Sequence, residues 1–168
     1  NLGNMYQYQL KDYEKAMEWY EKAYEMGGGS GAYNIGWMYE KGVGVETDYA
    51  KAMEWYKKGH EIGDDGHGAN NIGWMYQKGE GVEIDYAKAM EWYEKAYESG
   101  NGSGANNIGG MYRRGEGVEV DCTKAVEWYE KAYELGSGSA ANSIGYMYNC
   151  GEGVEQDFSK AMEWYEKA

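Results

Sequence analysis

The sequence contains no proline, only two cysteines and two histidines, and 16 basic residues against 29 acidic ones. The absence of proline and of any segment with strand periodicity leaves an all-α class. A net charge of -13 argues against a surface that wraps nucleic acid or adheres to anionic membranes, because phosphate groups require clustered basic side chains. No run approaches the roughly 18 apolar residues of a spanning helix, so we expect no membrane insertion.

Residues suited to catalysis are also scarce. No serine begins an SxxK motif, and no histidine is partnered by a repeated serine, so we expect neither an enzyme nor a cofactor. His60 and His67 bracket Asp64 and Asp65, and imidazole with carboxylate suits zinc or nickel. A polar surface loop is the favoured interpretation, because this spacing occurs nowhere else in the chain. The glycine-rich segments that recur along the chain follow predicted helices rather than strands, which argues against a phosphate-binding loop.

What the chain has in abundance is repetition. Tryptophans recur at intervals of 36, 37, 36 and 36 residues, a period typical of stacked helical hairpins. We interpret these tryptophans as core residues. They are Trp19, Trp55, Trp92, Trp128 and Trp164.

Residues 66–100 show how one repeat is expected to fold. Apolar residues at helical spacing predict a first helix that ends near Gly79. A short turn then leads to Asp85, which is placed to cap a second helix that carries Ala89, Trp92, Tyr93 and Ala96 on one side. An aspartate stands at the same point of every copy, so these residues are interpreted as caps and not as catalytic acids.

The pattern is similar to the Sel1-like repeat, a relative of the tetratricopeptide repeat. In the second copy, the motif appears in Ile35 and Gly36, in Gly42, Gly44 and Val45, and in the run from Lys51 to Tyr56. The resemblance implies a right-handed α/α superhelical solenoid of five two-helix repeats, about ten helices in a single domain. The copies are expected at about 1–27, 28–63, 64–100, 101–136 and 137–168, in what we expect to be a fragment of a longer chain. The compartment stays open, a secreted or periplasmic one included.

One departure from the family pattern concerns the first helices, and the first copy differs in its turn. Glycine replaces the usual alanine near the start of three first helices, at Gly31, Gly68 and Gly104, which predicts that these helices fray. The first copy lacks three residues of its turn, between Tyr6 and Asp12, so that turn is expected to be built differently.

The two cysteines leave two alternatives open. In antiparallel hairpins, Cys122 at the start of one second helix should lie near Cys150 at the end of the next first helix, so a disulfide is geometrically conceivable. The resemblance adds that cysteine-rich secreted members exist. Two unpaired thiols are the favoured alternative, since there is only one pair.

Positions that differ between copies are the candidates for a specific function. On the first helices, three such positions lie about opposite the predicted core face. They are Tyr33, Trp37 and Glu40; Asn70, Trp74 and Gln77; Asn106, Gly110 and Arg113; and Asn142, Tyr146 and Asn149. First helices line the concave groove in tetratricopeptide-like arrays, so these side chains are expected to form a platform that binds a peptide or protein segment. The alternative for Trp37 and Trp74 is packing between adjacent repeats.

Three functions fit these features of the sequence. The first is a non-enzymatic scaffold that holds a protein or peptide in the groove. The second is a structural component whose uncapped ends associate end to end into a longer array or filament. A carbohydrate or cell-wall ligand bound through the same aromatic residues is the third.

Overall fold

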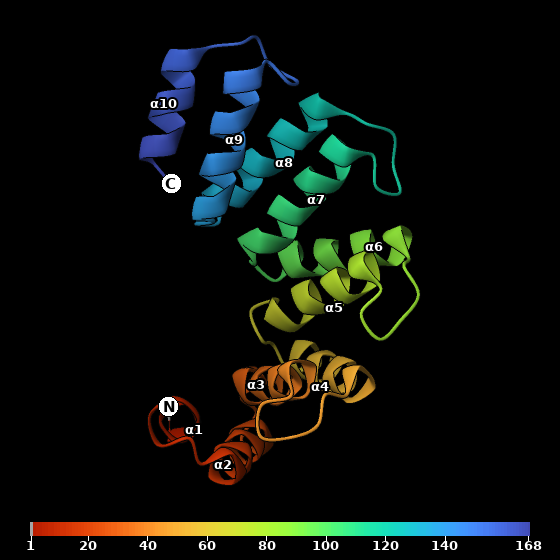
Figure 1. Cartoon of the computed structure of the whole chain (residues 1–168), viewed down its shortest axis with the longest axis vertical. Coiled ribbons are helices and arrows are strands. Elements are labelled where there is room, and N and C mark those ends of the chain that lie inside the picture. The colour runs from red at the N-terminus through yellow and green to blue at the C-terminus, as the bar shows by residue number, and fades with distance from the viewer. Residues whose placement is uncertain (1) are drawn as a thin grey trace. The chain divides into compact units, whose positions relative to one another are not determined.

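The computed structural model describes residues 2–168 and divides the chain into two compact units, the first ending at Ile84 and the second spanning Asp85–Ala168. Every regular element among these residues is a helix, and the helices of each unit follow one another as hairpins (Figure 1). Among the described residues, no helix combines the length and apolar character that membrane crossing requires. The predicted all-α architecture of two-helix repeats is confirmed.

The first unit holds the first two repeats and the first helix of the third. Its helices pack in chain order, and the first helices of neighbouring repeats, α3 and α5, also touch. The elements are α1 (Leu2–Asn4), η1 (Met5–Leu10), α2 (Tyr13–Glu25), α3 (Gly29–Lys41), α4 (Tyr49–Glu61) and α5 (His67–Lys78).

The second unit repeats this arrangement. Consecutive helices pack against each other, and the first helices α7 and α9 are in contact. The elements are α6 (Tyr86–Glu98), α7 (Gly102–Arg114), α8 (Cys122–Glu134), α9 (Gly138–Cys150) and α10 (Phe158–Glu166).

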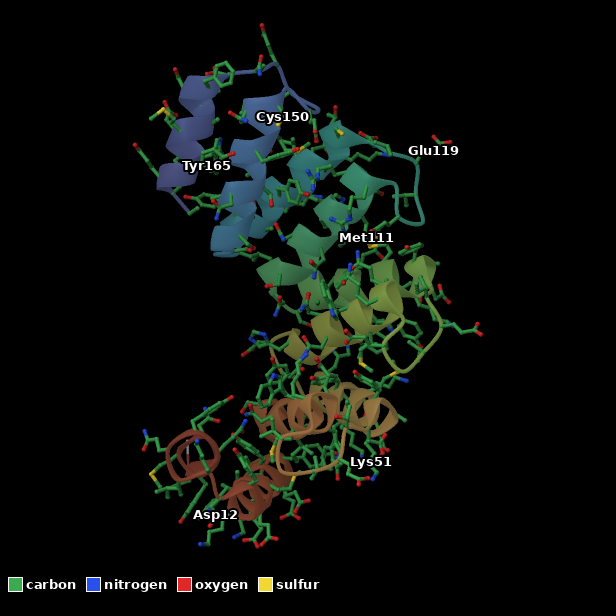
Figure 2. All side chains as sticks on the ribbon, in the orientation of Figure 1. Asp12, Lys51, Met111, Glu119, Cys150 and Tyr165 are labelled. Carbon is green, nitrogen blue, oxygen red and sulfur yellow. The ribbon has the colours of Figure 1, made fainter. Side chains whose placement is uncertain are left out.

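Each second helix begins at the predicted aspartate cap. Asp85 accepts a hydrogen bond from the Lys88 backbone amide at 3.0 Å, which satisfies one of the unpaired amides at the helix start. The same arrangement starts α2 at Asp12, which is labelled in Figure 2. The first helices α3, α5, α7 and α9 instead end at a glycine in the left-handed region, and for α5 this is Gly79 as predicted.

The glycines at the starts of the first helices do not cause the predicted fraying. Gly31, Gly68 and Gly104 all lie inside regular helices and are buried. A Cβ at Gly104 would stand 2.6 Å from the Tyr93 carbonyl oxygen, so the missing side chain lets α7 approach the α6 backbone. The prediction was wrong because it considered helix propensity and left out the close contact between helices.

The short turn of the first repeat is built differently from the others, as expected. Met5–Leu10 forms a π-helix, and Lys11 follows it in the left-handed region with φ of 53°. Glycines occupy the equivalent helix end in the other repeats, so Lys11 accepts backbone strain that they avoid.

The repeated tryptophans are not the core residues that we expected. Each is half-buried, whereas the tyrosine beside it is 0% exposed at Tyr20, Tyr56 and Tyr93. Trp55 packs edge-on against Tyr24 of the preceding second helix with ring centroids 5.3 Å apart. The Lys58 ammonium, from three residues later, lies 4.3 Å from the centroid of the same indole. Trp128 and Trp164 make the same edge-on contact with a tyrosine of the preceding second helix. These tryptophans therefore pack between neighbouring second helices, whereas Tyr20, Tyr56 and Tyr93 fill the interior.

Candidate functional site

In the first four repeats, a buried tyrosine of the second helix lies against the first helix of the same repeat. A phenol that is removed from water needs a hydrogen-bond partner, and the first helix supplies it. Tyr20 donates to Gln7 Oε1 at 2.5 Å, and Tyr56 donates to Glu40 Oε2 at 2.5 Å. We call this place on the first helix the hydroxyl-partner position; its occupants are Gln7, Glu40, Gln77, Arg113 and Asn149.

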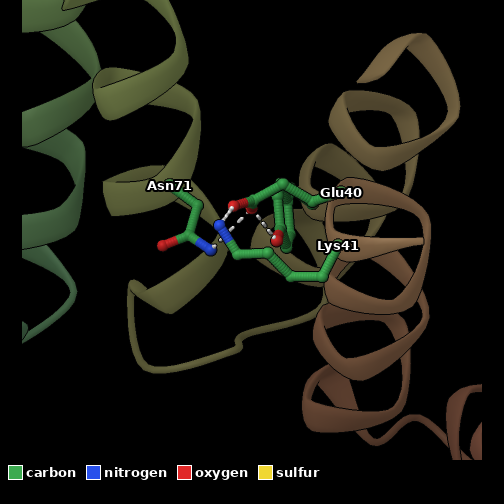
Figure 3. Close-up of polar contacts among 4 residues, drawn as sticks. Glu40, Lys41 and Asn71 are labelled. Atoms are coloured by element: carbon green, nitrogen blue, oxygen red, sulfur yellow. Dashed lines mark hydrogen bonds and ion pairs between the residues drawn. The ribbon is translucent and has the colours of Figure 1, made fainter. Parts of the chain in front are cut away.

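Glu40 makes several polar contacts at this position (Figure 3). Besides the Tyr56 hydroxyl, its carboxylate faces the Asn71 side-chain amide at 3.4 Å and forms an ion pair with Lys41. Burial, followed by the nearby Glu40 carboxylate, raises the pKa of Tyr56 well above its ordinary value. The phenol therefore stays protonated and acts as the donor.

This arrangement corrects part of the predicted platform. Glu40 is 7% exposed and Gln77 is 3% exposed, so neither side chain lies on an open face. The sequence pattern distinguished the core face of the first helix, with Ile35 and Met38, from the face predicted to be exposed. The tyrosine of the second helix, however, covers one edge of the face that was predicted to be exposed. Long polar side chains at this edge turn inward to the hydroxyl.

Candidates of the first unit, the largely buried Glu40 among them, surround an open hollow of about 390 Å³, which we call the first hollow. It lies over α3 and α5 and is lined by Tyr33, Trp37, Glu40, Lys41, Asn70, Asn71 and Trp74.

Its two indoles differ in exposure. Trp74 is 41% exposed, with Lys78 Nζ 4.9 Å from its ring centroid. Trp37 is half-buried, packs against the apolar cluster around Ile35 and Met38, and lies 6.4 Å from the Tyr8 ring. Trp37 therefore serves packing as well as lining the hollow, while Trp74 offers an open aromatic face.

A second hollow of about 350 Å³ lies in the second unit, over α7, α8 and α9. It is lined by Arg113, Tyr129, Asn142, Ser143 and Tyr146. The Arg113 guanidinium carbon stands 5.0 Å from the Tyr146 ring centroid, a cation–π distance. Tyr146 is 40% exposed, so it presents an aromatic face much as Trp74 does.

Three predicted site residues lie outside the two hollows. Gln77 is buried, and Asn106 accepts a hydrogen bond from the Ser143 hydroxyl at 3.3 Å. Asn149 is exposed near the end of α9, where its side-chain amide lies 3.9 Å from Cys150 Sγ.

The hollows also include residues that sequence reasoning missed. They are Lys41, Asn71, Tyr129 and Ser143. Asparagine recurs at the position of Asn71, as Asn34 and Asn107, so a residue that is the same in several copies can line a hollow.

The histidine and aspartate segment forms a tight turn. Asp64 is 4% exposed, and its carboxylate accepts hydrogen bonds from the backbone amides of Gly66 and Gly68 at the start of α5. His67 packs on Tyr33 with ring centroids 5.5 Å apart. Within residues 2–168, no group of three or more histidine, cysteine, aspartate or glutamate side chains is arranged to hold a metal ion, so the set of His60, Asp64, Asp65 and His67 remains a weak candidate.

Both cysteines are free thiols, the alternative that we favoured. Cys122 is half-buried at the start of α8, and the turn at Gly153 packs on its backbone. Cys150 is exposed at the end of α9, where Figure 2 labels it. Tyr146 hydrogen-bonds to Cys150, and this contact raises the pKa of the Tyr146 phenol.

Comparison with solved structures shows what this architecture is similar to. The chain is 31% identical to a Sel1 repeat protein from Oxalobacter formigenes, with a TM-score of 0.85 over 99% of this chain and 69% of that one. It is 37% identical to a protective antigen of uropathogenic Escherichia coli that displays an SLR fold, with a TM-score of 0.78 over 92% of this chain and 33% of the antigen. This chain thus spans a third of that protein's length.

Cysteine-rich protein B of Helicobacter pylori is a more distant neighbour. It is 26% identical, with a TM-score of 0.57 over 72% of this chain and 86% of that one. The search of functionally curated proteins gave no match.

The family comparison covers almost the whole chain. The model of the Sel1 repeat matches five segments, at residues 1–28, 29–64, 66–101, 102–137 and 138–168. The chain therefore belongs to the Sel1 repeat family, whose repeats form a non-catalytic scaffold that generally mediates protein–protein interaction.

Proposed function

We propose that this chain is an interaction scaffold that binds extended protein segments on its first helices, with side chains of the partner seated in the two hollows. The observation that carries the proposal is that Trp74 and Tyr146 occupy equivalent positions, on α5 and α9, and are each about 40% exposed above a hollow. Flat rings of this kind bury a large area at low entropic cost, which is why they dominate binding surfaces.

Polar groups beside the rings suit a peptide ligand. Asn70 and Asn142, at equivalent positions of the two hollows, carry amides that can both donate and accept hydrogen bonds. A peptide backbone offers the complementary groups at every residue. Hollows of about 350 and 390 Å³ lie at the lower end of ligand pockets, a size that fits one or two side chains each.

A selection with displayed random dodecapeptides tests this function. Peptides recovered on the 168-residue chain are synthesised, and their dissociation constants are measured for the parent, Trp74→Ala and Tyr146→Ala proteins. We expect at least one of the two substitutions to weaken each peptide roughly tenfold or more, as hot-spot aromatics do. Phe158→Ala is the matched control, since it removes an exposed ring outside both hollows.

The result that contradicts the proposal is equally specific. If the recovered peptides bind both ring-truncated proteins as tightly as the parent, while circular dichroism shows intact helices, the hollows are not the binding surface. The same conclusion follows if the selection recovers no peptide that binds the folded chain.

A second candidate function is end-to-end association of copies. On α10, Met162 is 65% exposed and Tyr165 is 43% exposed, whereas the equivalent Val126 and Tyr129 on α8 are 6% and 3% exposed. In the interior repeats, the following helices cover these side chains. We propose that the α1 and η1 segment of a second copy covers them here, because it presents Leu2, Tyr8 and Leu10 with 46 to 61% of their surface exposed.

A further inference from the structure

The two hollows are built from the same repeat positions but differ in charge. Moving along the chain by two repeats places Tyr146 where Trp74 stands and Asn142 where Asn70 stands. The same shift places Arg113 at the hydroxyl-partner position of Glu40. A buried carboxylate in the first hollow is therefore replaced by a guanidinium in the second.

The carboxylate of the first hollow already has its partners. Glu40 accepts a hydrogen bond from the Tyr56 hydroxyl, faces the Asn71 amide and pairs with Lys41. A buried charge is stable only when it is paired and hydrogen-bonded, and Glu40 meets that condition within the unit. The first hollow consequently has no unbalanced charge at its floor.

The guanidinium of the second hollow is less fully satisfied. Arg113 Nε is buried, and no atom of the described chain accepts a hydrogen bond from it. Its Nη1 atom lies 3.9 Å from the nearest carboxylate oxygen, that of Glu152, which is too long for a hydrogen bond. Arg113 does contact the Tyr129 hydroxyl oxygen, at the position where Gln7 and Glu40 contact Tyr20 and Tyr56. A guanidinium carries five N–H groups, so Arg113 can donate further hydrogen bonds beyond this contact.

The surroundings of Arg113 favour an anion. The residues that line the second hollow include no aspartate or glutamate. Both of its first helices, α7 and α9, lack acidic residues, and α7 ends in Arg113 and Arg114. Glycine at position 110, where the first hollow has Trp37, leaves one side of the hollow without a large ring.

The chain's net charge of -13 does not prevent anion binding at this place. Apart from Glu40, its acidic residues lie on the second helices and in the turns, and at physiological ionic strength charges are screened over about 8 Å. Glu152, from the turn after α9, is the carboxylate that approaches the guanidinium. An incoming carboxylate would compete with this long contact and would offer shorter, charge-assisted hydrogen bonds.

We propose that the second hollow selects an aspartate or glutamate side chain of the bound protein segment, through Arg113. This rests on the proposed function and adds a partner chemistry to it. The carboxylate bonds the guanidinium, the exposed Asn142 amide donates alongside, and the Tyr146 ring packs against the carbon atoms of the acidic side chain. The first hollow lacks this preference, because its floor carries Glu40.

The test uses the displayed dodecapeptides on three proteins: the parent chain, Arg113→Gln and Arg114→Gln. Glutamine occupies the hydroxyl-partner position naturally at Gln7 and Gln77, so Arg113→Gln should keep a partner for Tyr129. Arg114→Gln removes the same charge from the next residue, which pairs with Glu116 at 2.9 Å and lines neither hollow. Circular dichroism melts check that all three proteins fold.

We expect peptides selected on the parent to share an acidic residue at one fixed position. Changing that residue to its amide should weaken binding to the parent and to Arg114→Gln roughly tenfold, and binding to Arg113→Gln less than about twofold. Hollow-dependent peptides without a shared acidic residue would overturn the inference and leave the proposed function standing. A preference for the acidic residue that persists in Arg113→Gln would also overturn the inference. Failure to recover any peptide whose binding depends on the hollows would overturn both the inference and the proposed function.

Discussion

A residue that varies between repeats can still be structural, and the hydroxyl-partner position demonstrates this. Gln7 and Glu40 both receive a hydrogen bond from a buried tyrosine, although one is an amide and the other a carboxylate. Burial raises the pKa of Tyr20 to about 12, which keeps that donor protonated across the physiological range. What is preserved is the presence of a polar partner, and any side chain of suitable length supplies it.

Removing one hydroxyl should therefore be costly. We expect Tyr56→Phe to destabilise the chain by about 1–3 kcal/mol, because Glu40 loses its donor while its carboxylate stays buried. Urea unfolding followed by circular dichroism measures the difference. Glu40→Gln should cost much less, since glutamine fills the equivalent position at Gln7 and Gln77. A Tyr56→Phe variant as stable as the parent would show that the hydrogen bond contributes nothing.

The aspartate caps make stability depend on pH. Backbone and side-chain hydrogen bonds from Lys88 hold the pKa of Asp85 below its ordinary value of 3.8. The folded chain thus keeps this carboxylate ionised after the unfolded chain has taken up a proton, so stability that is present above about pH 4 is lost as the pH falls.

Asp85→Asn isolates this effect, because asparagine retains a capping oxygen but does not titrate. We expect the urea midpoints of the parent and the variant to differ most above about pH 4 and to converge as the pH approaches about 2. Midpoints that stay a constant distance apart over this range would contradict the prediction.

At the scale of the helix, two glycines of α7, Gly104 and Gly110, have opposite effects on stability. A Cβ at Gly104 would meet the Tyr93 carbonyl oxygen at 2.6 Å, and backbone cannot move aside cheaply. A Cβ at Gly110 would meet the side-chain end of Arg114, which is flexible. The first glycine is required by the approach of α7 to α6, and the second only lowers helix propensity.

We therefore expect Gly104→Ala to destabilise the chain by about 1–3 kcal/mol and Gly110→Ala to stabilise it by up to about 1 kcal/mol. Each variant serves as the control for the other, because the chemical change and the helix are the same. Thermal and urea unfolding measure both. A loss of stability in Gly110→Ala would mean that Arg114 cannot move away.

The end of the first repeat offers a stabilising substitution. Lys11 holds φ of 53° at the position where Gly79 and Gly115 hold 74° and 70°. Lys11→Gly should stabilise the chain by up to about 1 kcal/mol, because glycine adopts this conformation without strain. Lys11→Ala, which removes the side chain but keeps the Cβ, should bring no such gain. A gain of equal size in both would locate the effect in the lysine side chain and not in the backbone.

The sequence predicted the elements better than it predicted their faces. Periodicity and aspartate caps located the helices, because both depend on residues close in the chain. The burial of Glu40 and the partial exposure of Trp55 depend on helices that pack from other parts of the chain, and a helical wheel does not contain them. The hollows required the structure, since Asn71 and Ser143 come from the neighbouring repeat and Tyr129 from a second helix.

At the scale of the whole molecule, acidic residues concentrate on the second helices and the turns, while amide side chains concentrate on the first helices. This separation gives the chain a strongly solvated surface and a surface with few charges to desolvate. Binding through the first helices therefore avoids most of the cost of stripping water from carboxylates. The proposed end contact uses a different surface, the exposed side of α10, so the two functions can be tested separately.

Met162 provides that test, because residues 2–168 include a second strongly exposed methionine, Met26, that serves as its control. Met162 is 65% exposed on α10, and Met26 is 88% exposed after α2. If copies stack through α10, sedimentation of the parent chain over a concentration series should show mass rising above that of the monomer. Met162→Glu should raise the midpoint of association at least about tenfold, since a carboxylate would be buried in the contact. Met26→Glu introduces the same charge away from the contact and should leave the midpoint unchanged. A parent chain that stays monomeric at every concentration, or two variants that behave alike, would remove end-to-end association and leave the hollows as the chain's binding surfaces.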